Sequence, residues 1–239
     1  MKKPFLILSI CLVIFSCSPD RVLFDELTLK GEIAYFNSKL FTGLTFDVYD
    51  NGQLVMELSY KDGKQNGLCK SWYENGHLKD EYNWKDGKQH GLCKSWYENG
   101  QLDNEWNFQD GEKNGQCKSW YENGQLAYIS NYKGGEINGL YQFWYENGQL
   151  EREWNYQNGE KNGLCKTWYE NGLLKYVDNW KDGKADGVWK SWYENGQLLY
   201  EWNFQDGQLN GLSQGWYENG ELRNAEIYKD NVLIKTIFN

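Results

Sequence analysis

Proline and histidine are both rare in this sequence, with two of each among 239 residues. The near absence of proline leaves long stretches free to form paired strands, because proline removes a hydrogen-bond donor from a sheet. The two histidines, His77 and His90, have no third partner at the spacing of a metal site or a catalytic triad. We therefore expect no catalytic residue, no metal and no cofactor.

Basic residues are fewer than acidic ones, with 25 Lys and Arg against 34 Asp and Glu, which gives a formal net charge of −9. Proteins that bind nucleic acids or anionic membrane surfaces present clustered Lys and Arg. The charge balance therefore argues against both kinds of partner. Disorder is also disfavoured, because aromatic residues make up 17% of the chain and disordered segments contain few of them.

Long hydrophobic runs are missing except near the start, where two lysines precede an apolar stretch over residues 5–15. This stretch is too short to span a bilayer and is typical of a secretory signal. It ends in Ile-Phe-Ser-Cys at residues 14–17, which resembles a bacterial lipobox. We expect residues 1–17 to be a signal peptide and Cys17 to be the lipid attachment site, so that a lipid anchor alone holds the protein in the bacterial cell envelope, outside the cytoplasm. The alternative is an ordinary signal that is cleaved elsewhere or not at all.

A five-residue sequence, Trp-Tyr-Glu-Asn-Gly, organises the rest of the chain. It occurs seven times, always 24 residues apart, from Trp72 to Trp216. A weaker copy, Val-Tyr-Asp-Asn-Gly, begins in register at Val48. The repeats cover residues 43–231, and a fixed period of this length predicts stacked supersecondary units.

Two dipeptides in each unit predict hairpin turns. In the unit over residues 67–90 they are Asn75-Gly76 and Asp86-Gly87. Both pairs are typical of two-residue type I′ turns, in which both central residues have φ > 0. Each unit should therefore consist of two antiparallel strands.

The fold class that follows is all-β, an elongated single-layer antiparallel β-meander of 24-residue hairpin repeats. Its end strands need caps, because they expose unpaired backbone groups. Residues 30–37 and 232–238 are predicted to supply capping strands, for about eighteen strands in total. The repeat domain should span residues 30–239, after a linker over residues 18–29.

Counting outward from Asn75-Gly76 predicts which side chains share a face of the sheet. We expect one face to be packed, because its aromatic rings lie across from glycines. The other face should be charged. The predicted pairs on the packed face are Tyr73 with Leu78, Ser71 with Asp80, Cys69 with Tyr82 and Gly67 with Trp84. Those on the charged face are Trp72 with Lys79, Lys70 with Glu81 and Leu68 with Asn83.

Four cysteines occupy one slot of their units on the packed face. Equivalent positions in successive units lie two strands apart, ~9 to 10 Å, which is too far for a disulfide or a shared zinc ion. We interpret these cysteines as space-filling side chains with free thiols. They are Cys69, Cys93, Cys117 and Cys165.

The repeated tryptophans fall on the charged face, where nothing else in the chain is left to cover them. A ladder of exposed aromatic rings suits a protein partner or stacking on sugar rings. The alternative is that Lys79, Lys175 and Arg223 cover some of the rings by cation–π stacking. The candidate partner-binding stripe consists of Trp72, Trp96, Trp120, Trp144, Trp168, Trp192 and Trp216.

The units resemble MORN repeats, in particular a bacterial subtype in which Tyr-Glu-Asn-Gly-Gln-Leu alternates with Lys-Asp-Gly-Lys-x-Asn-Gly. The resemblance recurs eight times, covers nearly all of the expected mature chain and implies an elongated single-layer β-meander. Many chains of this subtype are labelled YwqK-type antitoxins. For a secreted, lipidated chain, the implied toxin–antitoxin role would be immunity against a toxin that acts outside the cytoplasm.

The sequence therefore favours a non-enzymatic, envelope-attached MORN-repeat scaffold that binds a protein partner, with a toxin as one such partner. The repeated glutamates stand at turns and too far apart in successive units to act as a catalytic carboxylate pair. The alternative function is a carbohydrate or cell-wall binding module, because Trp-Tyr pairs in short hairpin repeats also resemble choline-binding repeats.

Overall fold

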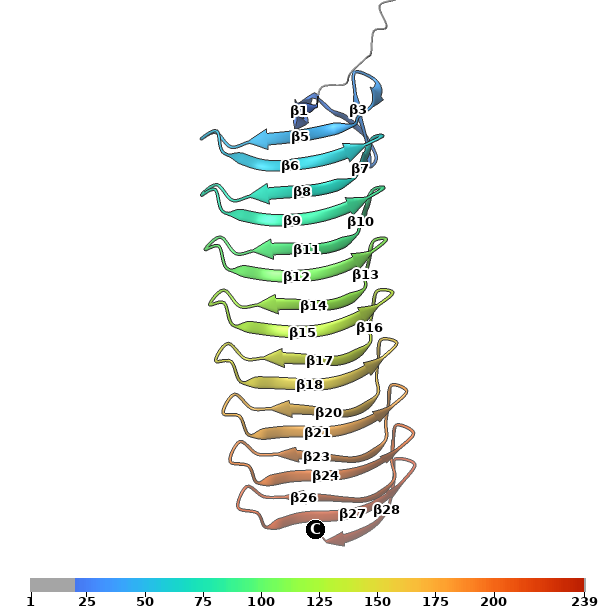
Figure 1. The fold of residues 1–239 in the computed structure, drawn as a ribbon. Coiled ribbons are helices and arrows are strands. Elements are labelled where there is room, and N and C mark those ends of the chain that lie inside the picture. The colour runs from blue at the N-terminus through green and yellow to red at the C-terminus, as the bar shows by residue number, and fades with distance from the viewer. Residues whose placement is uncertain (1–19, 239) are drawn as a thin grey trace, which may run out of the picture.

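The computed structural model describes residues 20–238, which form a ladder of hairpins (Figure 1). The main sheet has 25 strands, and a second, three-stranded sheet lies at its N-terminal end. Consecutive long strands pair antiparallel along the whole ladder, so the predicted all-β meander is confirmed. Among the described residues, no helix is long and apolar enough to cross a membrane.

Each unit contains one strand of six residues and one of eight. The six-residue strands are β5 (Gly43–Val48), β8 (Gly67–Trp72), β11 (Gly91–Trp96), β14 (Gly115–Trp120), β17 (Gly139–Trp144), β20 (Gly163–Trp168), β23 (Gly187–Trp192) and β26 (Gly211–Trp216). The eight-residue strands are β6 (Leu54–Lys61), β9 (Leu78–Lys85), β12 (Leu102–Gln109), β15 (Leu126–Lys133), β18 (Leu150–Gln157), β21 (Leu174–Lys181), β24 (Leu198–Gln205) and β27 (Leu222–Lys229).

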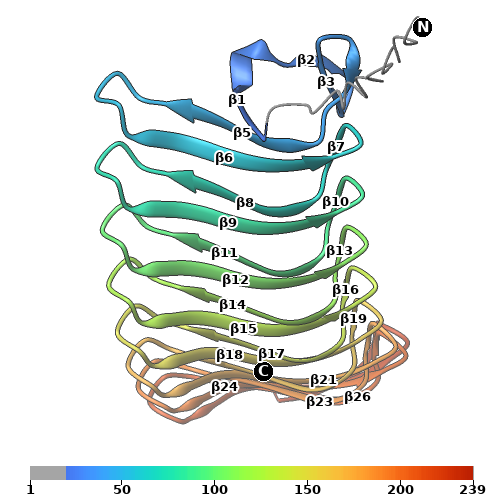
Figure 2. The same ribbon diagram turned by 45° about the horizontal axis from the view of Figure 1, so that its top comes forward.

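A two-residue strand follows each Asp-Gly turn and the equivalent turns at Gly134-Gly135 and Asn158-Gly159, which is why the main sheet has more strands than the expected eighteen. After β10 the chain reaches Gly91, whose φ of +84° interrupts the pleat, and β11 then pairs with β9 in a shifted register. Figure 2 shows these short strands gathered along one side of the ladder, where the sheet bends. They are β7 (Lys64–Gln65), β10 (Lys88–Gln89), β13 (Glu112–Lys113), β16 (Glu136–Ile137), β19 (Glu160–Lys161), β22 (Lys184–Ala185) and β25 (Gln208–Leu209).

The Asp-Gly turns have the predicted conformation, and the Asn-Gly turns do not. At Asp86 and Gly87, φ is +51° and +82°, as a type I′ turn requires. In the other turn only Gly76 has positive φ, the Gly76 N–H donates to the Tyr73 carbonyl at 2.9 Å, and the Tyr73 N–H donates to the His77 carbonyl at 2.9 Å. These bonds close a three-residue loop, and the prediction of a type I′ turn at Asn75-Gly76 is wrong.

The longer loop changes the pairing next to it. Trp72 pairs with Leu78, so Lys79 is an extra residue on β9, and the predicted pairs of Trp72 with Lys79 and Tyr73 with Leu78 are wrong. Beyond this bulge the predicted register is confirmed. The observed pairs are Ser71 with Asp80, Lys70 with Glu81, Cys69 with Tyr82, Leu68 with Asn83 and Gly67 with Trp84.

The N-terminal cap is larger than expected. Residues 18–29, expected as a linker, include β1 (Arg21–Leu23), which pairs parallel with β5, and a 3-10 turn, η1 (Phe24–Glu26). The second sheet consists of β2 (Thr28–Lys30), β3 (Ile33–Phe36) and β4 (Lys39–Leu40). The expected leading strand over residues 30–37 therefore belongs to this small sheet and does not pair with β5.

A hydrophobic cluster joins the small sheet to the first unit of the ladder. Val22, Ala34, Phe41 and Tyr60 are its buried members. Backbone hydrogen bonds run from the Ala34 N–H to the Gly63 carbonyl and from the Gly63 N–H to the Phe41 carbonyl, both at 2.7 Å. At the opposite end, the predicted last strand is present as β28 (Val232–Phe238), antiparallel to β27.

Candidate functional site

The seven tryptophans of the stripe all lie on one face of the sheet, which we call the Trp face, and all are partly exposed. Trp72 lies two residues from Lys70 on a regular strand, so both side chains point to this face. The bulge brings Leu78 opposite Trp72, and the equivalent leucines lie opposite the other six tryptophans. Each tryptophan is therefore one half of a Trp–Leu pair.

The cations expected to cover the tryptophans lie over other rings. Lys79 Nζ is 5.5 Å from the Tyr73 ring centroid, and Lys175 Nζ is 5.0 Å from that of Tyr169. Arg223 lies over Tyr200 at 4.8 Å. The expected covering of the Trp rings by these three cations is therefore wrong.

Two further rows run along the Trp face beside the stripe. A charged row is formed by ion pairs such as Lys70 with Glu81 at 3.1 Å and Lys190 with Glu201 at 2.9 Å. Beyond it lies a row of exposed aliphatic side chains. These are Leu68, Leu92, Leu140, Leu164, Val188 and Leu212.

The backbone beneath the stripe is tied from unit to unit. The Tyr73 hydroxyl donates to the Trp96 carbonyl at 2.8 Å, and the same bond joins the tyrosine of each earlier unit to the tryptophan of the next, up to Trp216. Asn75 Nδ2 likewise donates to the Glu98 carbonyl of the next unit at 3.0 Å. The Tyr and Asn of the repeated motif therefore fix the spacing of the tryptophans.

The opposite face, which we call the ring face, contains the buried cysteine slot. Cys69, Cys93, Cys117 and Cys165 are buried and free, and burial raises the pKa of each thiol. Within residues 20–238, no group of three or more His, Cys, Asp or Glu is placed to hold a metal ion. The expected lipid attachment site, Cys17, lies outside the described residues.

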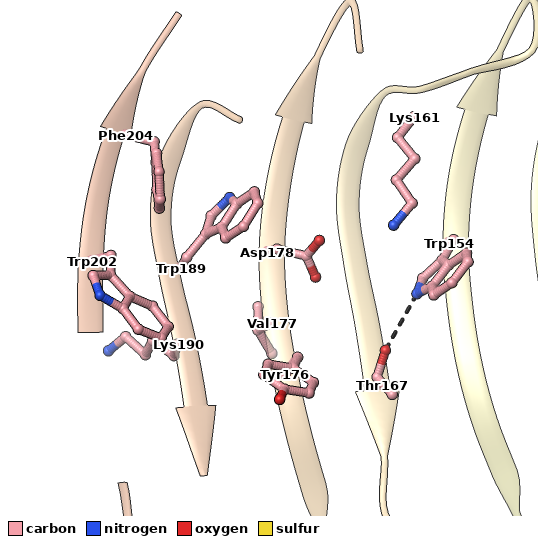
Figure 3. Close-up of a pocket in the computed structure, with 10 residues that line it drawn as sticks. All are labelled: Trp154, Lys161, Thr167, Tyr176, Val177, Asp178, Trp189, Lys190, Trp202 and Phe204. Carbon is pink, nitrogen blue, oxygen red and sulfur yellow. Dashed lines mark hydrogen bonds between the residues drawn. The ribbon is translucent and has the colours of Figure 1, made fainter. Parts of the chain in front are cut away.

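A hollow on the ring face was missed by the sequence analysis (Figure 3). It has a volume of about 410 Å³ and lies around Asp178, between Trp154 on one side and Trp189 and Trp202 on the other. Trp180 Nε1 donates a hydrogen bond to Asp178 Oδ2. Burial raises the pKa of the Asp178 carboxyl, and this bond and the charge of Lys161 oppose the rise.

The eight units match one family model, described as MORN repeat variant. The matched segments are residues 41–62, 65–86, 89–110, 113–133, 137–158, 161–182, 185–206 and 209–230. No curated protein matches the chain. The match extends over most of the ladder, and its segments begin 24 residues apart, which is the period read from the sequence.

Proposed function

We propose, on the premise that the chain belongs to the MORN repeat variant family, that it is a non-enzymatic scaffold which is attached to the cell envelope and binds a protein partner through its Trp face. MORN repeat proteins are generally scaffolds without enzymatic activity. The observation that carries the proposal is the row of seven partly exposed tryptophans on a regularly tied backbone. Aromatic side chains in such positions supply most of the binding energy at protein interfaces.

The composition of the Trp face supports a protein as the partner. Trp–Leu pairs and the exposed aliphatic row offer apolar contacts, and the ion pairs between them offer polar contacts that set the register of a partner. The backbone bonds between units hold the tryptophans in place before binding, so little ordering is needed when a partner docks.

The partner test compares a triple tryptophan variant of the central units with a single lysine variant. Changing Trp96, Trp120 and Trp144 to Ser should leave the circular dichroism spectrum unchanged and abolish capture of the partner in a pull-down. Changing Lys94 to Ala in the same unit should weaken capture much less, because exposed ion pairs contribute little. If the Trp variant unfolds and capture falls only in proportion to the folded fraction, the stripe is structural and the proposal is wrong.

An immunity or antitoxin role is the specific form of this proposal that the family resemblance suggests. A toxic protein encoded beside this chain should then bind the purified scaffold, and co-expression with secretion should restore growth. A neighbouring toxin that binds equally to the Trp96, Trp120 and Trp144 variant would separate the antitoxin role from the Trp face.

Envelope attachment rests on the lipobox-like residues 14–17. The Cys17→Ser variant should leave the membrane fraction and should lose incorporation of labelled fatty acid. Replacement of Cys11 by Ser is the matched control and should change neither. Equal labelling of the Cys17→Ser variant would show that the anchor is elsewhere.

A further inference from the structure

The hollow around Asp178 arises because its unit lacks the aromatic ring that four of the eight units have at this position. The same slot contains Tyr82, Trp106, Trp154 and Trp202 in four other units. Aspartate is much smaller than these rings, so a space opens between Trp154 and Trp202, which stand on either side of it along the ladder (Figure 3).

The neighbouring tyrosine does not fill this space. In the unit around Ser130, where the ring is also missing, Tyr128 stacks on Tyr141 with ring centroids 6.2 Å apart, and Tyr141 stacks in turn on Trp154 at 6.0 Å. Tyr176 occupies the position equivalent to Tyr128, but it remains 44% exposed at the edge of the hollow. The cavity at Asp178 is therefore open to a ligand.

Aromatic walls and a few polar groups line the hollow. Trp189, Trp202 and Phe204 form one wall, and Trp189 packs on Phe204 with centroids 4.5 Å apart. Trp154 and Lys161 form the other, with Lys161 Nζ 3.8 Å from the Trp154 ring centroid. This combination of apolar walls with a small number of convergent polar groups is typical of a small-molecule site.

The polar groups present both signs of charge. Asp178 Oδ2 accepts the hydrogen bond from Trp180, and within residues 20–238 the second oxygen, Oδ1, has no hydrogen-bond partner. Lys161 Nζ has no carboxylate within ion-pair distance among the described residues. A ligand in the hollow therefore meets a free acceptor and a free donor.

From this arrangement we infer that the hollow binds a neutral sugar ring. Its hydroxyls donate to Asp178 and accept from Lys161, and its apolar face lies on the indole rings of Trp189 and Trp202, because Lys161 already lies over Trp154. An organic cation is disfavoured, because the Lys161 ammonium, which is part of the lining of the hollow, would repel it. An anion is disfavoured by the Asp178 carboxylate. A neutral polyol satisfies both charged groups without either penalty.

The inferred sugar site is separate from the proposed partner surface. Asp178 pairs with Cys165, which belongs to the buried slot of the ring face, whereas the tryptophan stripe lies on the Trp face. Sugar binding and partner capture should therefore be lost independently, and failure of one proposal leaves the other standing.

The decisive variant restores the ring that the repeat has elsewhere. The purified full chain is titrated with cellobiose, maltose and N,N′-diacetylchitobiose, and intrinsic tryptophan fluorescence and calorimetry are recorded. At least one sugar should bind saturably in the millimolar range. Asp178→Tyr should weaken that binding at least tenfold, because tyrosine refills the hollow, and should not lower the melting temperature.

Two further variants separate the effect of the Asp178 charge from a general effect of substitution. Asp178→Asn preserves the shape of the hollow and should weaken binding severalfold through loss of the charged acceptor. Trp192→Ser, on the Trp face, is the matched control and should bind as the unchanged protein does. The inference is overturned if none of the three sugars binds saturably, if Asp178→Tyr binds normally, or if tetramethylammonium binds in the hollow and the sugars do not.

Discussion

Gly134 takes the first position of a two-residue turn that has a different residue in the other units. Its φ is +56°, close to the +49° to +53° of its counterparts. Asparagine and aspartate tolerate this conformation better than other side chains do. The counterparts are Asp62, Asp86, Asp110, Asn158, Asp182, Asp206 and Asp230.

The Gly134→Asn variant should therefore be more stable by about 0.4–1 kcal/mol, because asparagine restricts the unfolded chain and still fits the turn. The matched control is Gly135→Asn, at φ +82°, which should gain less or lose stability. Urea unfolding of both variants measures the difference. Equal effects at the two positions would mean that the first turn position has no special tolerance.

Several tyrosines of the ladder should make the fold sensitive to alkali. Burial raises the pKa of Tyr97 to about 12, with Asp103 adding to the rise, and burial also raises the pKa of Tyr128 to about 12. A tyrosine in the unfolded chain has a pKa of about 10, so the unfolded state loses these protons at a lower pH than the folded state does. Stability should be intact below pH 10 and should fall as the pH rises from about 10 to about 12.

Unfolding midpoints in urea, measured from pH 8 upward, would show this fall. Tyr97→Phe and Tyr128→Phe should each make it shallower, because phenylalanine carries no titrating hydroxyl. An unfolding midpoint that stays constant through pH 12 would contradict the prediction.

At the scale of the hairpin, neighbouring units are joined by a hydrogen bond from a tyrosine hydroxyl to a tryptophan carbonyl. The Tyr145 hydroxyl donates to the Trp168 carbonyl at 2.9 Å. Tyr145→Phe should lower the free energy of unfolding by about 1 kcal/mol, the net value of one hydrogen bond. Tyr217→Phe is the control, because Tyr217 belongs to the last unit and is 51% exposed. If chemical unfolding shows that both variants lose a similar free energy of unfolding, the hydrogen bond between units does not contribute to stability.

Much of the hairpin could be predicted because the repeat supplies its own check. The pair of Lys70 with Glu81 and the pair of Cys69 with Tyr82 follow from counting between two turns. The loop at Asn75 could not be predicted from its dipeptide. Its length is set by the Asn75 side chain, whose Oδ1 accepts from the His77 N–H at 2.9 Å. The resulting bulge moved Leu78 to the Trp face.

The candidate sites differ in how visible they were. The stripe from Trp72 to Trp216 could be seen in the sequence, because its members recur at one position and are partly exposed as expected. The hollow had a signal too, an aspartate in an aromatic slot. No function could be predicted for Asp178, because whether Tyr176 fills the gap depends on packing that the spacing of residues does not fix.

At the scale of the whole molecule, each unit contacts mainly its two neighbours. The ladder should therefore tolerate a change in the number of its units. Deletion of residues 91–114 removes one period of 24 residues. It joins His90 to Gly115, so that His90 takes the place that Asn114, its equivalent, has in the intact chain. The shortened protein should fold and unfold at a modestly lower urea concentration.

Deletion of residues 91–102 removes half a unit and is the control. It places strand residues on the wrong face of the sheet, so it should abolish the cooperative transition seen by circular dichroism. If the half-unit deletion folds as well as the whole-unit deletion, the ladder does not depend on its period.

The strands run across the ladder, and β1 and β28 lie at its opposite ends (Figure 1). A load applied between those ends would therefore pull neighbouring strands apart at one edge and open their hydrogen bonds in sequence, as a zipper opens. Each unit of 24 residues would release on the order of 80 Å of extended chain. Under such a load the protein would lengthen in even steps, one unit at a time.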